Sequence, residues 1–109
     1  MCEPIDIRKT VLKEVYDLLS TCEVDYVANL VEEAICISKD NEQFYDERMG
    51  YAWERINELE SHGVSDAYYL RGWYESAREN DLELLKAQIT TDAYEEALEV
   101  LDQILSWND

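Results

Sequence analysis

The chain has 109 residues, of which 47% are hydrophobic and 32% charged, with only 3 glycines and 1 proline. This length and apolar content predict one folded domain with a single core and argue against disorder. The net charge of −17, from 26 acidic and 9 basic residues spread over both halves, disfavours direct binding to nucleic acid or to an anionic membrane.

Two helices are predicted in the first third of the chain. The first begins at Pro4, a residue suited to a first helical turn, and ends near Ser20. The second follows Thr21 as its N-cap and ends near Ile37. In both segments apolar residues recur at the spacing of one helix face, so each is expected to bury one side.

A third helix is predicted from Asp40 to His62. Asp40 followed by Gln43 resembles a capping box, and His62 with Gly63 is a typical C-terminal stop. Trp53 belongs to the stripe that we expect to face inward. The outer stripes of the second and third helices contain Asp25, Glu32, Glu33, Glu47, Tyr51, Glu54 and Glu58.

Up to three more helices are predicted in the last third of the chain. One begins after Ser65 and ends near Asn80, with Tyr68 on its outer side, and a short one follows from residue 81 to about residue 89. The last begins after Thr91, in "DAYEEALEVLDQILSWND", a stretch with six acids and no lysine or arginine. The acids on its outer face span an arc of about 120°. They are Asp92, Glu95, Glu96, Glu99 and Asp102. The predicted fold is therefore all-α, one compact bundle of five or six amphipathic helices forming a single domain over residues 1–109.

Residue patterns that carry catalysis, cofactors or metals are absent from the sequence. His62 is the only histidine, and no nucleophile lies near it in sequence. There is no Cys/His cluster for zinc, no calcium loop, no glycine-rich phosphate loop and no ExxH motif for di-iron. We therefore expect a protein that is not an enzyme and that needs no cofactor and no metal.

The acidic faces and the 8 tyrosines indicate a protein-binding surface. Carboxylates on neighbouring helices approach the charge density of a nucleic-acid backbone, and arginine pairs with either group. Tyrosine is a favoured anchor at interfaces. We therefore expect a basic nucleic-acid-binding protein as partner, such as a nuclease. The expected contacts are Asp25, Glu32, Glu33, Glu47, Tyr51, Glu54, Glu58, Tyr68, Glu95, Glu96, Glu99 and Asp102.

A small, tyrosine-rich, strongly acidic helical chain with segments such as "AYEEALEVLDQIL" resembles the phage-encoded DNA-mimic inhibitors, which include anti-restriction and anti-CRISPR proteins. The resemblance covers the whole chain in composition and texture and shares no diagnostic motif. It implies a protein that blocks the nucleic-acid channel of a host defence enzyme, in the host cytoplasm.

Other interpretations stay open. An immunity protein that neutralises a basic nuclease toxin would have the same charge, and a helical adaptor could carry a merely solvated acidic face. The aromatic content would also suit a homodimer. Three cysteines without CxxC spacing, no signal peptide and no apolar run of roughly 20 residues favour a cytoplasmic protein without membrane segments.

Overall fold

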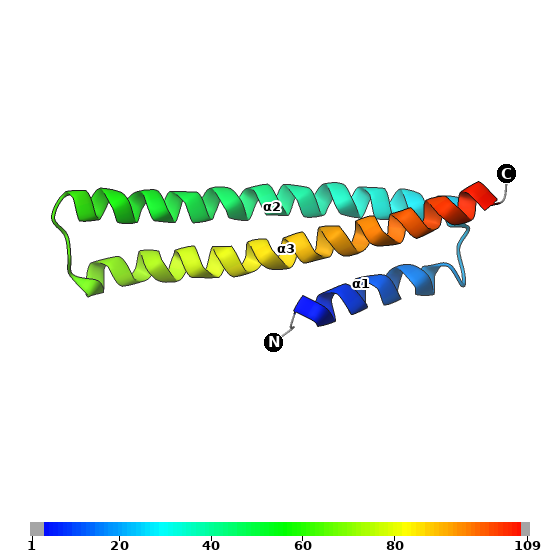
Figure 1. Cartoon of the computed structure of the whole chain (residues 1–109), viewed down its shortest axis with the longest axis horizontal. Coiled ribbons are helices and arrows are strands. Elements are labelled where there is room, and N and C mark those ends of the chain that lie inside the picture. Colours follow the sequence, from blue (N-terminus) through cyan, green and yellow to red (C-terminus); the bar gives the residue numbers. More distant parts are fainter. Residues whose placement is uncertain (1–3, 108–109) are drawn as a thin grey trace. The chain divides into compact units, whose positions relative to one another are not determined.

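A computed structural model describes residues 4–107, with side chains from residue 6 onward. Within this range it contains three helices and no strand: α1 (Pro4–Leu18), α2 (Val24–Ser61) and α3 (Ala67–Trp107). The chain has two compact units. Within each unit the segments of α2 and α3 lie side by side and run antiparallel, and a short connection in the second unit joins the two helices (Figure 1). The all-α prediction is confirmed. The prediction of five or six helices in one compact bundle is wrong, because two expected helices merge into α2 and three into α3.

Polar residues that often end helices lie in the interior of α2 and α3. Asp40 occupies an exposed position within α2. Asn80 donates a hydrogen bond from Nδ2 to the Ser76 carbonyl at 2.8 Å, and Thr91 donates from Oγ1 to the Ala87 carbonyl at 3.0 Å. Each of these bonds reaches back one turn within α3, so the polar side chain is satisfied without ending the helix.

The predicted stop at His62 and Gly63 is confirmed. Gly63 adopts a φ of 82°, in the left-handed region that glycine enters without steric cost. Its N–H donates to the Glu60 carbonyl at 3.0 Å, and the Val64 N–H donates to the Leu59 carbonyl at 3.0 Å. These two bonds form a Schellman motif, which satisfies carbonyls that the end of α2 would otherwise leave unpaired.

The other helix ends follow different rules. At the start of α3, the Asp66 carboxylate accepts a hydrogen bond from the Tyr68 N–H at 2.8 Å, as an N-cap does. The prediction of Thr21 as the N-cap of the second helix is wrong. Thr21 Oγ1 donates instead to the Leu18 carbonyl at 3.5 Å, at the end of α1, and α2 begins only at Val24.

Contacts between residues divide the chain into two units. Within the described range, unit 1 consists of α1 with residues 24–40 of α2 and 86–107 of α3, and unit 2 is Asn41–Leu85. All four lysines of the sequence fall in unit 1, and four of its five arginines fall in unit 2. The core of unit 1 is formed by Val15, Val27, Ala28, Val31, Ala97 and Leu101. Unit 2 buries Ala52, Ile56, Leu70 and Ala77.

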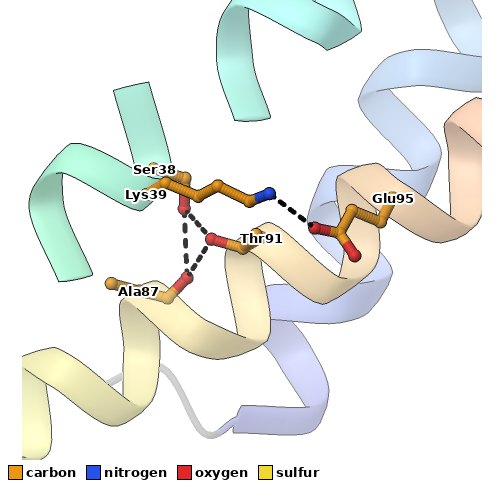
Figure 2. A network of polar contacts seen from close by, with 5 residues as sticks. All are labelled: Ser38, Lys39, Ala87, Thr91 and Glu95. Carbon is orange, nitrogen blue, oxygen red and sulfur yellow. Dashed lines mark hydrogen bonds and ion pairs between the residues drawn. The ribbon is translucent and has the colours of Figure 1, made fainter. Parts of the chain in front are cut away.

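A pair of buried hydroxyls links α2 to α3 in unit 1 (Figure 2). Ser38 Oγ lies 2.6 Å from Thr91 Oγ1 and 3.0 Å from the Ala87 carbonyl oxygen. Thr91 Oγ1 lies 3.0 Å from the same carbonyl. Because each hydroxyl has one proton, one side chain donates to the carbonyl while the other donates to its neighbour. Buried polar groups need partners, so this cluster favours one register of α2 against α3.

Candidate acidic interface

The twelve residues predicted to contact a partner lie almost entirely on the surface. Eleven are exposed, and Glu96 is half-buried. Unit 1 holds Asp25, Glu32, Glu33, Glu95, Glu96, Glu99 and Asp102. Unit 2 holds Glu47, Tyr51, Glu54, Glu58 and Tyr68. The predicted residues therefore form two sets, and each is described within its own unit.

An ion pair aligns two acidic rows in unit 1. Lys39 Nζ on α2 lies 3.5 Å from Glu95 Oε1 on α3 (Figure 2). Glu99 and Asp102 follow Glu95 by one and two turns, and Glu32 precedes Lys39 by two turns. Since the helices are antiparallel, the three carboxylates continue the same seam between them. We call Glu32, Glu95, Glu99 and Asp102 the acidic seam.

Three of the ten predicted acids are neutralised by bases of this chain. Arg8 on α1 holds Glu96 with two hydrogen bonds, from Nε at 3.0 Å and from a terminal nitrogen at 2.6 Å. Lys39 pairs with Glu95, and Arg55 pairs with Glu58 at 2.9 Å. The bidentate contact explains why Glu96 is half-buried, and it makes Glu96 less available to a partner than its neighbours.

The other seven acids form no ion pair among the side chains that the structure describes. They are Asp25, Glu32, Glu33, Glu47, Glu54, Glu99 and Asp102. Glu47 accepts a hydrogen bond from the Gln43 amide at 3.2 Å. Glu32 and Glu33 line an open depression of about 830 Å³ on α2. Most of the predicted negative charge is thus exposed and uncompensated.

The two predicted tyrosines occupy different surroundings within unit 2. Tyr68 is 82% exposed and packs edge-on against Tyr69, with ring centroids 5.7 Å apart. Tyr51 is 56% exposed and packs edge-on against Trp73 at 5.8 Å. Both rings can reach a partner, and Tyr51 is the better fixed because its neighbour Trp73 is half-buried.

Unit 2 also carries a second kind of surface, rich in aromatic residues, which was not predicted from the sequence. Trp53, predicted to face inward, is 45% exposed and packs edge-on against Tyr74 at 5.9 Å. The Tyr74 hydroxyl donates to Glu60 at 2.9 Å, and this hydrogen bond is the main cause that raises the pKa of the phenol above its ordinary 10.0. The sequence did offer a signal for this surface. Trp73 and Ala77, four residues apart, belong to the inward stripe of their helix, and Tyr74 lies to one side of that stripe.

The histidine and the cysteines lie apart from one another in the sequence, and metal-ligating side chains do not converge among those described in residues 6–107. His62 is exposed at the end of α2, Cys22 and Cys36 are free thiols, and Cys2 lies outside the described residues. No group of three or more His, Cys, Asp or Glu side chains in this range is placed to hold a metal ion. None of the described helices has an apolar stretch of the length that a bilayer requires.

Comparison with known proteins assigns no relative to the chain. No protein-family model, no curated protein and no solved structure matches it.

Proposed function

We propose that this protein is a non-enzymatic inhibitor that binds the basic nucleic-acid-binding surface of a nuclease or similar defence enzyme by mimicking nucleic-acid charge. The observation that carries the proposal is the exposed, uncompensated carboxylate set, seven of the ten predicted acids. A protein that needed acids only for solubility would gain from mixing lysines among them, because interspersed charges stabilise helices slightly.

The acidic seam supplies the spacing that supports mimicry. Glu95, Glu99 and Asp102 are separated by four and three residues, which is about 6 and 4.5 Å along the helix axis. One DNA strand carries a charge about every 3.4 Å. Glu32 on the adjacent helix adds charge to the same seam, so the combined density comes nearer to that of a phosphate backbone.

The first experiment is capture of the partner from lysate of the source cell, with washes at low and then high salt. Mass spectrometry should identify one DNA- or RNA-acting enzyme that salt releases and that its own nucleic acid displaces. A nuclease that nucleic acid fails to displace would favour an immunity protein instead. A partner that resists salt and ignores nucleic acid would favour the adaptor and contradict the proposal.

The acidic seam is then tested with a triple charge reversal, Glu95→Lys, Glu99→Lys and Asp102→Lys. Affinity for the captured enzyme should fall by about 100-fold or more, because attraction to a basic site becomes repulsion. The fold should persist, since an exposed ion pair such as Lys39–Glu95 contributes only about 0–1 kcal/mol.

The matched control reverses three exposed acids outside the predicted set: Asp40→Lys, Asp46→Lys and Glu79→Lys. It changes the net charge by the same amount, so a loss of binding that both triples share would reflect total charge alone. Unchanged affinity of the seam triple would remove the end of α3 from the interface.

A further inference from the structure

One flank of unit 2 forms an aromatic face. Met49, Trp53, Tyr74, Arg78 and Asp81 line a cavity of about 420 Å³ on it. A second cavity of about 460 Å³ shares Tyr74 and Arg78 and continues toward the start of α3. We call the five residues named first the Trp53–Tyr74 face. Its two rings pack against each other, and each is still more than two-fifths exposed.

The two units differ in how their helices are covered. In unit 1, α1 buries Val11 and Val15 and so covers α2 and α3 on one side. Unit 2 contains segments of α2 and α3 only, with no third helix in the described range. Eight of the twelve large hydrophobic side chains exposed in that range lie in unit 2. Helices gain most of their stability from packing, so a covering partner would stabilise a two-helix unit with this much exposed apolar surface.

Charges of both signs lie on this flank. The two cavities are lined by Arg71, Glu75, Arg78 and Asp81. Arg71 pairs with Glu75 at 3.0 Å. Arg78 and Asp81 form no ion pair or hydrogen bond among the side chains described. One cation and one anion are therefore available three residues apart on α3.

We propose that a second copy of this chain covers the Trp53–Tyr74 face, giving a homodimer in which the two unit 2 hairpins form a four-helix bundle. In a two-fold interface the same patch meets itself, so each group on it must find its complement on the same patch. If two α3 helices cross antiparallel, with the axis midway between Arg78 and Asp81, Arg78 of each copy lies opposite Asp81 of the other. The aromatic rings pack on either side of these two ion pairs, as hairpins do in four-helix bundles.

Charge complementarity favours a second copy over other occupants. A face that binds a basic partner is expected to carry carboxylates alone, and a face that binds an acidic partner is expected to carry arginines alone. This face carries both. The opposite flank of unit 2 is a weaker candidate because its cations are already engaged. Arg48 lies over the Phe44 ring at 5.3 Å, and Arg55 lies over the Trp73 ring at 5.6 Å.

The test is a charge swap followed by sedimentation analysis. The unmodified chain should sediment increasingly as a dimer as its concentration is raised to about 100 µM. Arg78→Asp places two acids opposite each other, and Asp81→Arg places two arginines opposite each other. Each single variant should weaken dimerisation by at least about 30-fold, because like charges across an interface repel.

Combining the two substitutions, in one chain or in a mixture of chains, makes the test specific. The double variant, Arg78→Asp with Asp81→Arg, restores opposite charges and should recover the dimer. An equimolar mixture of the two single variants should form a heterodimer. At positions 78 and 81 one copy then presents two acids and the other presents two arginines. Lys13→Asp, an equal charge change on the exposed surface of α1, should leave the dimer intact, and circular dichroism should show equal helicity throughout.

A monomeric unmodified chain over the whole concentration range would overturn the proposal, as would dimerisation that persists in both single variants. Failure of the mixture to associate would overturn the two-fold geometry. This proposal does not rest on the inhibitor function, because Arg78 and Asp81 are not among the predicted contacts and the acidic seam belongs to unit 1. The swapped variants should bind a captured basic enzyme through unit 1 whether or not they dimerise.

Discussion

Among single residues, Tyr94 on α3 has a perturbed titration that can be measured. Burial is the main cause that raises the pKa of its phenol above 10.0, and the nearby Glu14 carboxylate on α1 adds to the shift. A raised pKa means that the folded state holds the phenolic proton more tightly than the unfolded state does. The resulting stability is complete below pH 10.0 and is lost as the pH rises through the raised pKa.

Tyr94→Phe removes this proton, so the unmodified chain should lose stability relative to the variant only above about pH 10. Denaturant unfolding of both proteins between neutral pH and pH 11 measures the difference. Glu14→Gln should make the decline smaller, because without the neighbouring negative charge the folded-state pKa lies closer to the unfolded value. A difference between the proteins that stays constant with pH would contradict the assigned cause.

For the helices as elements, the turn between α2 and α3 gives the sharpest prediction. Gly63→Ala places a Cβ on a residue with a φ of 82°, which costs about 1–2 kcal/mol of unfolding free energy. Gly72 lies within α3, and a Cβ there meets no atom within 4 Å. Gly72→Ala should therefore stabilise the protein by about 0.5–1 kcal/mol. Denaturant unfolding of the two variants should give changes of opposite sign, and equal changes would contradict the helix-end role of Gly63.

The same elements show what the sequence can and cannot predict. The helix stop at Gly63 is a local pattern, and it led to a correct prediction. The expected breaks at Asp40 and Thr91 were wrong. Asp40 is exposed, so water solvates its carboxylate inside the helix, and Thr91 is tolerated there because the Ala87 carbonyl one turn back accepts its hydroxyl proton. The prediction that Trp53 faces inward was wrong. In unit 2 each helix packs against only one other helix, so its buried stripe is narrower than that of a helix packed against two.

The whole molecule carries a charge of −17, and self-repulsion of that size opposes compact folding. Raising the salt concentration from about 0.02 to about 0.5 M should therefore raise the melting temperature by about 4 °C or more. The Asp40→Lys, Asp46→Lys, Glu79→Lys variant has less repulsion and should gain less. A melting temperature that salt leaves unchanged in both proteins would show that the repulsion is already relieved by local ion pairs.

At this scale the sequence predicted the charge of the candidate interface but not how its parts come together. Which carboxylates become neighbours depends on the register of α2 against α3, and that register involves the contacts of Lys39 with Glu95 and of Ser38 with Thr91. Partners this far apart in sequence leave no local pattern. The single domain over residues 1–109 stays a prediction, which coincident melting curves from tryptophan fluorescence and circular dichroism would support.

The division of the basic residues between the units has a practical consequence for experiments on this protein. Lysine side chains react with amine-selective reagents and arginine side chains do not, and every lysine belongs to unit 1. Coupling through amines would tether the chain by unit 1 and leave the Trp53–Tyr74 face in solution. A sensor chip prepared in this way would report self-association faithfully while obstructing the acidic seam. Attachment through a cysteine introduced in unit 2, with the native cysteines of unit 1 replaced by serine, would reverse that bias.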